Sequence, residues 1–226
     1  MALTACNTRQ SASPTETPAP TSSPDVTEAA ESVHWLETET NGVSIGVWYP
    51  AGWETDLSDG LVLAEQTPSV NGISAEGILI HCFVPALDEF TPNAMHINYA
   101  WEVLDWVVKM PNHTGWDVVM TAPRAFVWSE HNAAYYLYST GDGVRAVVLA
   151  LALPNQEKVV ICNVSSAMSQ ANRIRASLPQ LLAGLMIDGT TLDSTSLDTL
   201  PDPLMFPLYS RSSPNGEQQI SATVPQ

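Results

Sequence analysis

The residue types that usually perform catalysis are present in this chain, but their spacing does not group them. The five histidines are scattered, and no pair has the H-x-x-x-H or C-x-x-C spacing from which zinc sites are built. No serine stands in the G-x-S-x-G sequence that places a nucleophile on a strand-to-helix turn. His81 and Cys82 are neighbours, but adjacent strand residues point to opposite faces. We therefore expect no catalytic residues, no bound metal and no cofactor.

Two carboxylate positions could suggest acid–base or metal chemistry. Glu102 and Asp105 are three residues apart on a predicted helix, yet Asp105 and Lys109 have the i,i+4 spacing of an exposed ion pair. Asp142 lies between two glycines, where a calcium ligand would fit but a tight hairpin turn is explanation enough. We therefore favour an exposed ion pair at Asp105 and a hairpin turn at Asp142 over catalysis or metal binding.

Seven tryptophans offer aromatic surface for a ligand. Aromatic side chains dominate ordinary protein cores, and we expect a core position for Trp48, Trp101 and Trp128. Trp53 and Trp116 are instead in or beside glycine-containing turns, which brings them toward solvent. These two are the candidate ligand contacts, in a cleft that would take a sugar or an apolar molecule.

The N-terminal region has the composition of an unstructured tether. Residues 7–32 contain four prolines, ten serines or threonines and no aromatic residue. Such a segment cannot bury enough apolar surface to offset the entropy lost on ordering. We therefore expect residues 1–32 to be disordered, with Cys6 near the start.

The residues before Cys6 resemble the processing site of bacterial lipoproteins. Leu3-Thr4-Ala5-Cys6 has the aliphatic residue, the two small residues and the obligatory cysteine of that pattern. The resemblance implies a lipid attached to Cys6 and an extracytoplasmic, membrane-anchored protein. A signal sequence also has a charged start and an apolar stretch of about 7 to 15 residues. Residues 1–5 would therefore be a truncated signal remnant. The alternative is an ordinary N-terminus with a chance cysteine.

The charge balance excludes several partners. The chain has 24 acidic and 8 basic residues and a net charge of −16 at pH 7. This charge repels phosphate backbones and anionic headgroups, so nucleic-acid binding and electrostatic membrane adhesion are disfavoured. No apolar run approaches the roughly 20 residues of a transmembrane helix. Membrane association would therefore depend on Cys6.

Two further cysteines leave two alternatives open. Cys82 and Cys162 would form an even pair in an oxidising compartment, where disulfides persist. Both lie inside strongly apolar predicted strands, at residues 78–84 and 159–164, where a free cysteine behaves as a small buried hydrophobe. The pattern favours free thiols, with a disulfide as the second alternative.

The order of predicted elements indicates an α+β fold. Asn41-Gly42 between strand-like flanks predicts a β-hairpin. Short connections later in the chain predict an antiparallel meander, with strands at residues 125–129, 133–139, 144–153 and 158–164. The strand at 144–153 is apolar on both alternations, so the sheet must be covered on both faces.

Helices or further strands must provide that cover, and the sequence predicts two helices. Thr91-Pro92 is typical of a helix start, and Pro111 would end that helix. The second helix begins near Ala171, and Pro179 should break or kink it, with Ser177 as a candidate cap of a fresh helix over residues 178–185.

The pentapeptide Tyr49-Pro50-Ala51-Gly52-Trp53 and the order of elements around it resemble PsbP-like domains. This family occurs in photosystem extrinsic subunits and in many bacterial lipoproteins of unassigned role. The resemblance implies an αβα sandwich with a mostly antiparallel central sheet over residues 33–187, and a binding or scaffold role with no shared catalytic residues. Residues 188–226 would form an extended or partly disordered acidic tail, with an apolar patch at 204–209 that could dock on the domain.

The sequence therefore predicts a non-enzymatic extracytoplasmic lipoprotein that binds a protein or another component of the cell envelope. A carrier of a sugar or an apolar molecule, with a cleft near Trp53 and Trp116, is the alternative. A hydrolase of unknown type is the third.

Overall fold

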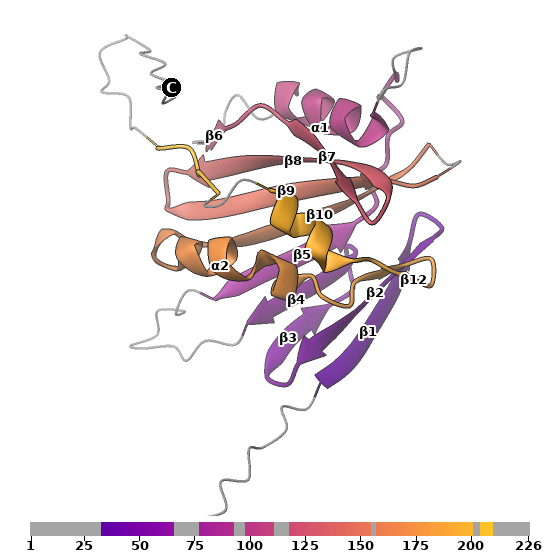
Figure 1. The fold of residues 1–226 in the computed structure, drawn as a ribbon, viewed down its shortest axis with the longest axis horizontal. Helices are drawn as coiled ribbons and strands as arrows, with labels where there is room; N and C mark the ends of the chain where they lie inside the picture. Colours follow the sequence, from indigo (N-terminus) through magenta and orange to yellow (C-terminus); the bar gives the residue numbers. More distant parts are fainter. Residues whose placement is uncertain are drawn as a thin grey trace, which may run out of the picture. The chain divides into compact units, whose positions relative to one another are not determined.

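The computed structural model describes residues 33–65, 77–92, 98–110, 118–154, 157–200 and 204–209. These residues form a large and a small antiparallel sheet with short helices packed against them (Figure 1). The large sheet has the strand order β3-β4-β5-β10-β9-β8-β6, and β7 also pairs with β8. The small sheet has the order β1-β2-β11-β12.

The helices and strands lie between Val33 and Thr199. The large sheet consists of β3 (Trp53–Asp56), β4 (Leu61–Glu65), β5 (Ile78–Phe83), β6 (Val118–Met120), β7 (Arg124–Trp128), β8 (His131–Thr140), β9 (Val144–Ala152) and β10 (Val159–Ala167). The small sheet consists of β1 (Val33–Thr40), β2 (Val43–Pro50), β11 (Met186–Ile187) and β12 (Thr190–Thr191). The helices are α1 (Tyr99–Lys109), α2 (Ala171–Leu181) and the 3₁₀ segments η2 (Met168–Gln170) and η3 (Ser194–Thr199).

The hairpin predicted at Asn41-Gly42 is confirmed. Both residues have positive φ, 49° and 71°, and Thr40 pairs with Val43 on either side of the turn. Positive φ at both central residues is the requirement of a two-residue turn between twisted strands, and asparagine and glycine meet it at low cost.

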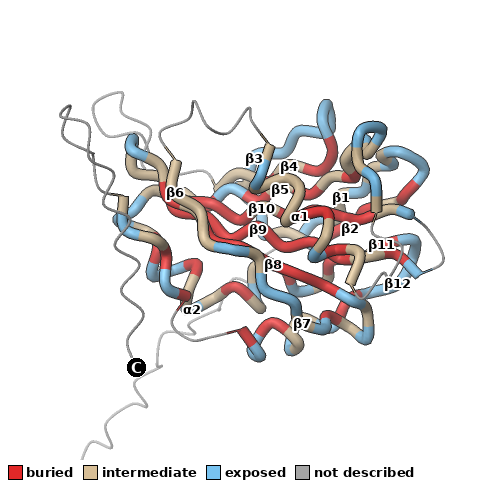
Figure 2. The backbone as a smooth tube through the Cα atoms, turned by 90° about the horizontal axis from the view of Figure 1, so that it is seen from above, coloured by how far each residue is buried: buried red, intermediate tan, exposed pale blue. Residues whose placement is uncertain are grey.

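The central strands are covered on both faces, as their composition requires. On β9, Val147 and Leu149 belong to the main core cluster, whereas Val148 and Ala150 belong to a second cluster. The second cluster includes α1, and the main cluster includes α2, η3 and the small sheet. Buried chain runs through β8, β9 and β10 between these layers (Figure 2). The protein is therefore the predicted α+β sandwich with a mostly antiparallel central sheet, and a small second sheet shares one covering layer with the helices.

The predicted start of α1 at Thr91-Pro92 is wrong. The helix begins after Asn98, which has an extended backbone and whose side chain accepts a hydrogen bond from the Trp101 N–H at 3.0 Å. The Asn98 amide also donates to the Ala133 carbonyl at 2.9 Å, which ties this cap to β8. Because the Asn98 side chain both caps α1 and bonds to β8, its contact with the sheet determines where the helix begins.

The predicted break in α2 is also wrong. Pro179 lies in the last turn of a helix that continues to Leu181, and the Leu182 N–H still donates to the Leu178 carbonyl at 3.2 Å. The Ser177 hydroxyl donates back to the Arg173 carbonyl instead of capping a new helix. A proline so close to the end removes one hydrogen bond without ending the helix before it.

The folded domain extends beyond the predicted boundary at Ile187. β11 pairs with β2, and the residues that follow supply buried side chains to the main core: Leu192, Leu197, Leu200, Leu204 and Phe206. Arg175 of α2 donates to the Leu204 carbonyl at 2.7 Å and lies 5.0 Å from the centre of the Phe206 ring. Leu204 and Phe206 of the predicted apolar patch are thus buried in the core, whereas Met205 and Leu208 are largely exposed. The segment that contains Leu204 and Phe206 is therefore part of the folded domain and not a tail.

An ion pair joins α2 to the large sheet. Both terminal nitrogens of Arg173 contact the Glu65 carboxylate at 2.8 Å, and Glu65 also accepts the Ile78 N–H at 3.2 Å. The Arg173 guanidinium holds the pKa of Glu65 below its ordinary value of 4.5, against the opposing effect of partial burial. Because this pKa is lowered by folding, the carboxylate contributes stability that is present above its unfolded pKa and lost as the pH falls through its folded pKa.

We expect Glu65→Gln to lower the free energy of unfolding by up to about 1 kcal/mol at neutral pH. The difference from the wild type should shrink as the pH falls from 4.5 through the lower folded pKa, because the wild-type carboxylate also becomes protonated over that range. Urea unfolding across this range measures it, with Asp198→Asn on the exposed end of η3 as control. A difference that stays constant with pH would contradict the electrostatic origin.

Two turn glycines provide a matched test of packing. Gly52 and Gly60 both have positive φ, 86° and 96°. An added Cβ at Gly60 would lie 2.6 Å from the Cys82 carbonyl oxygen, whereas at Gly52 nothing lies within 4 Å. We expect Gly52→Ala to cost about 1 kcal/mol for its backbone conformation alone. Gly60→Ala should cost a further 1–3 kcal/mol or so for the clash, measured by urea unfolding. Equal losses would show that the backbone at Gly60 relaxes.

Candidate functional site

Three of the sequence-predicted site residues can be compared with the structure, and two cannot. Cys6 and Trp116 lie outside the described residues. Trp53 opens β3, opposite Glu65 of β4, and is half-buried against the main core. Of the two expected cleft residues, the described part of the chain therefore contains Trp53, and part of the Trp53 surface is taken up by packing against the core.

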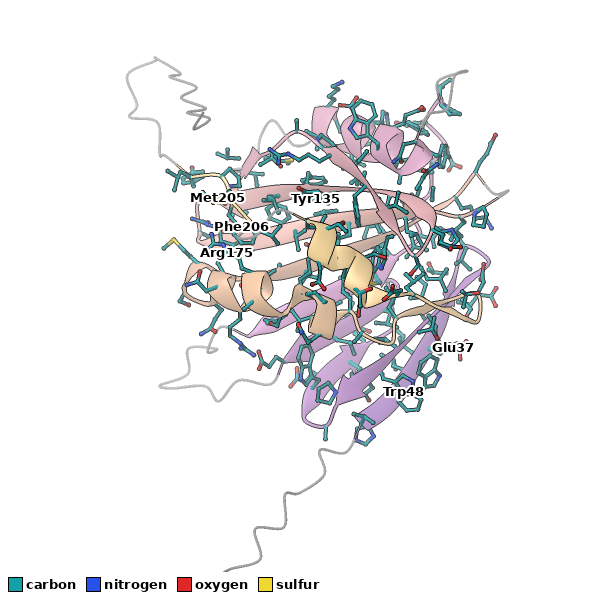
Figure 3. All side chains as sticks on the ribbon, in the orientation of Figure 1. Glu37, Trp48, Tyr135, Arg175, Met205 and Phe206 are labelled. Atoms are coloured by element: carbon teal, nitrogen blue, oxygen red, sulfur yellow. A yellow bond between two sulfur atoms is a disulfide. The ribbon has the colours of Figure 1, made fainter. Side chains whose placement is uncertain are left out.

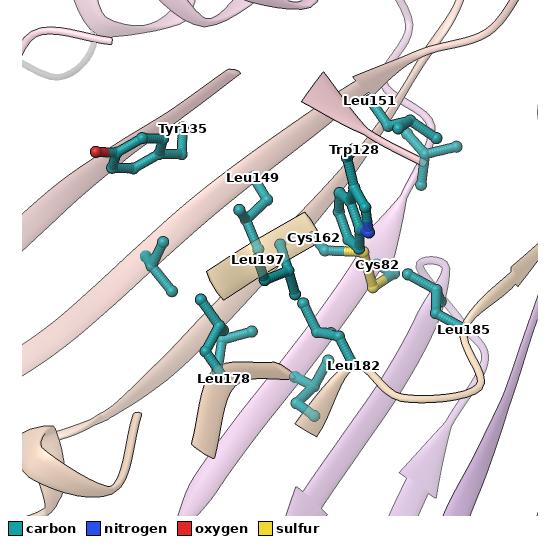
Figure 4. Packing of buried hydrophobic residues seen from close by; sticks show 14 of the residues in the cluster. Cys82, Trp128, Tyr135, Leu149, Leu151, Cys162, Leu178, Leu182, Leu185 and Leu197 are labelled. Atoms are coloured by element: carbon teal, nitrogen blue, oxygen red, sulfur yellow. A yellow bond between two sulfur atoms is a disulfide. The ribbon is translucent and has the colours of Figure 1, made fainter. Parts of the chain in front are cut away.

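The remaining two residues, Cys82 and Cys162, form a disulfide. They face each other directly in the pairing of β5 with β10, with a Cα–Cα distance of 4.1 Å. Both are essentially inaccessible to solvent, and they share the main core cluster with Trp128 (Figure 4). The sequence favoured free thiols because it did not reveal that β5 and β10, 80 residues apart, are neighbouring strands.

Several titratable side chains of the described residues take part in structural contacts. No three His, Cys, Asp or Glu side chains in this part of the chain are placed to hold a metal ion. The His81 ring contacts the Asp59 carbonyl oxygen at 2.5 Å. Asp105 and Lys109 form the predicted ion pair at 2.6 Å, and Asp142 accepts a hydrogen bond from the Thr140 hydroxyl within its turn.

A small pocket opens between β8 and the chain after η3. Its volume is about 100 Å³, and it is lined by Thr121, Arg124, Tyr135, Leu137 and Met205. Clefts that enclose organic ligands usually measure about 300–1,000 Å³. Figure 3 shows Tyr135 and Met205 at this end of the domain. The pocket is too small to enclose a sugar or a lipid chain.

The distribution of tryptophans differs from the prediction at two of the three positions expected in the core. Trp128 is buried as predicted, but Trp48 is 52% exposed and Trp101 is 37% exposed. On β2, the residues that enter the core are Val43, Ile45 and Val47. Alternation along a strand therefore places Trp48 with Ser44 and Gly46 on the opposite face. That period-two pattern was the sequence signal for an exposed Trp48.

Trp48 is part of an organised solvent-facing surface on β1 and β2. Trp35 is paired with Trp48, and their ring centres are 5.1 Å apart with the planes at 54°. Glu37 and Glu39 follow Trp35 on the same face of β1. We call Trp35, Trp48, Glu37 and Glu39 the tryptophan–glutamate face.

Glu37 is held next to the indoles in its charged form. Its carboxylate accepts a hydrogen bond from the Ser44 hydroxyl at 2.6 Å and one from the Trp35 indole N–H at 3.3 Å. These two hydrogen bonds, the Ser44 one foremost, lower the pKa of Glu37 below its ordinary value of 4.5. The face thus combines two aromatic rings with a permanent negative charge at neutral pH.

Comparison with known proteins returns similarities of structure only. No protein-family model and no curated protein matches the sequence. The solved structures that are similar include a PsbP protein from the cyanobacterium Synechocystis, CyanoP, with 14% identity and a TM-score of 0.44 over 75% of this chain and 99% of that one. CyanoP belongs to the family that the Tyr49-to-Trp53 pentapeptide resembles.

Two further solved structures are similar, with lower TM-scores. LpqN, described as involved in cell envelope biogenesis of Mycobacterium tuberculosis, has 10% identity and a TM-score of 0.42 over 69% of this chain and 91% of that one. The Ran-binding protein Mog1p of Saccharomyces cerevisiae has 13% identity and a TM-score of 0.34 over 66% of this chain and 84% of that one.

The disulfide should make a large contribution to stability. It closes a loop of 80 residues, for which the chain-entropy relation gives about 4.5 kcal/mol. We expect the double variant Cys82→Ala/Cys162→Ala to lose about this much free energy of unfolding in urea, while Cys6→Ser is unchanged.

A thiol titration provides an independent check of the same bond. In the unfolded, non-reduced chain without lipid, only Cys6 should react. Three reactive thiols, or a loss of less than about 1 kcal/mol in the double variant, would contradict the assignment.

Proposed function

We propose that this chain is a non-enzymatic binding module that works outside the cytoplasm. It is anchored to a membrane by a lipid on Cys6, and it presents its folded domain to a protein of the cell envelope. The observation that carries the binding role is the tryptophan–glutamate face, where two indoles are fixed on the solvent side of a sheet. Exposed tryptophans are rare on surfaces without a partner and are enriched at protein interfaces.

The Cys82–Cys162 disulfide supports the location. Disulfides persist in secreted and periplasmic proteins and are rare where glutathione and thioredoxin keep thiols reduced. This bond lies inside the core and is shielded from solvent. A structural disulfide of this kind, in a chain with no other buried cysteine among the described residues, fits folding in an oxidising compartment.

The run Leu3-Thr4-Ala5-Cys6, which resembles a lipoprotein processing site, supports a lipid anchor at Cys6. Within the described residues, no helix has the length and apolar composition that a membrane crossing requires. The net charge of −16 works against adhesion to anionic headgroups. A lipid on Cys6 supplies membrane affinity that does not depend on either feature.

A cysteine substitution tests the anchor in cells. We expect Cys6→Ser, expressed from its own gene in its native host, to move the protein from the membrane fraction to the soluble extracytoplasmic fraction. Intact-mass analysis should find the lipid on the wild type and on the control Ser13→Ala, and no lipid on Cys6→Ser. A wild-type protein with a free, unprocessed N-terminus would contradict the proposal.

The binding role is tested by crosslinking the wild-type protein in native membranes and identifying what is captured. We expect one envelope protein to be recovered repeatedly, and not with a control lipoprotein of similar charge. Recovery of the chain alone under all crosslinking conditions would contradict a scaffold role.

A further inference from the structure

We propose that the tryptophan–glutamate face docks an arginine- or lysine-bearing segment of a partner protein. This inference rests on the proposed binding function and names the chemistry of the partner. Figure 3 shows Trp48 and Glu37 at the β1–β2 end of the domain, well away from the pocket residues Tyr135 and Met205. The face is therefore a surface separate from the pocket.

The pairing of β1 with β2 determines which side chains this face presents. Trp35 is opposite Trp48, Glu37 is opposite Gly46, and Glu39 is opposite Ser44. Beyond the tryptophans, Val33 is opposite Pro50, and Val33 is largely exposed. The face thus changes along the strands from apolar, through aromatic, to acidic. An amphipathic basic segment would match it in the same order.

Two glycines make room for the indole rings. A Cβ added at Gly46 would lie 2.3 Å from Cζ2 of Trp35, so the ring rests directly on the backbone of β2. A Cβ added at Gly184 would lie 3.2 Å from Cδ1 of Trp48. The rings are therefore held in defined positions before any partner arrives, which lowers the entropy cost of binding.

The charges around the rings select a cation. The Glu37 carboxylate accepts a hydrogen bond from the Trp35 indole N–H. At the acidic end of the face, the Asp188 carboxylate accepts a hydrogen bond of 2.9 Å from the Ser44 N–H. Indole faces attract guanidinium and ammonium groups through the ring quadrupole, and adjacent carboxylates strengthen that attraction. The excess of 24 acidic over 8 basic residues steers basic partners toward the molecule.

A protein segment fits this surface better than a small molecule does. Small ligands gain affinity by being enclosed, and Trp48 is half exposed on an open sheet surface. A neutral sugar could stack on Trp48 and donate a hydroxyl hydrogen bond to Glu37, but it carries no positive charge to pair with the carboxylate and the indole faces. Binding that requires the ring, the carboxylate and a positive charge on the ligand therefore distinguishes a basic segment from a sugar.

The test is a titration of the full chain with a short peptide of alternating arginine and serine, followed by calorimetry at low salt. A peptide with glutamine in place of arginine is the neutral control. We expect Trp48→Ala and Glu37→Gln each to weaken binding about tenfold, and Trp48→Phe to retain most of it. The matched controls Trp101→Ala, an exposed tryptophan of α1, and Asp198→Asn should stay within about twofold of the wild type.

Several results would overturn the inference. One is binding of the glutamine peptide as tightly as the arginine peptide. Another is a loss of affinity in the control variants as large as in Trp48→Ala and Glu37→Gln. A third is Trp48-dependent binding of neutral oligosaccharides in place of the arginine peptide. If Trp48→Ala lowers stability, Glu37→Gln and Trp48→Phe still decide the question. A partner captured equally well by wild type and by Trp48→Ala/Glu37→Gln would reject this face while leaving the proposed function intact. Failure to capture any partner would instead reject the proposed function.

Discussion

The structure depends on one constraint: β9 and β10 carry apolar side chains on both faces, so neither face of the large sheet can be left in water. Helix α1 covers one face through Ala100, Val103 and Leu104, while α2, η3 and the small sheet cover the other. Burial of this much apolar surface is the main favourable contribution to folding. The Cys82–Cys162 disulfide lies on the face of the large sheet that α2, η3 and the small sheet cover, and it joins β5 to β10, where the two strands are already paired.

The same constraint positions the candidate interaction surface. Val43, Ile45 and Val47 of β2 complete the cover of the large sheet, and they turn the other face of β2 toward solvent. Trp48 and its partner Trp35 are exposed as a consequence of that register. Gly46 and Gly184 then leave space for the two rings, and Ser44 holds Glu37 beside them. The candidate interaction surface does not reduce core packing, because its side chains are on the face of β1 and β2 that does not contact the core.

Local features of the chain were predictable wherever nearby residues decide the conformation. The Asn41-Gly42 turn, the meander through β8, β9 and β10, and the Asp105–Lys109 ion pair all follow from residues close together in the sequence. Several predictions that depended on residues far apart in the chain failed. The start of α1 depends on a contact from Asn98 to Ala133, and the domain boundary depends on Leu204 and Phe206 reaching α2. Trp48 was assigned to the core from its residue type, although its position in the alternation of β2 already indicated solvent.

By itself, the sequence determined the fold class, because apolar residues on both alternations of a strand require cover on both sides and short connections require antiparallel neighbours. It also determined the charge of the molecule and the candidate lipid site at Cys6. Only the tertiary structure decided that Cys82 faces Cys162, that the chain after Ile187 belongs to the core, and that Trp35 and Trp48 meet beside Glu37. The physical reason is the same in each case. Strand pairing and packing between residues far apart in the chain depend on the sum of many contacts, and no single stretch of sequence contains them.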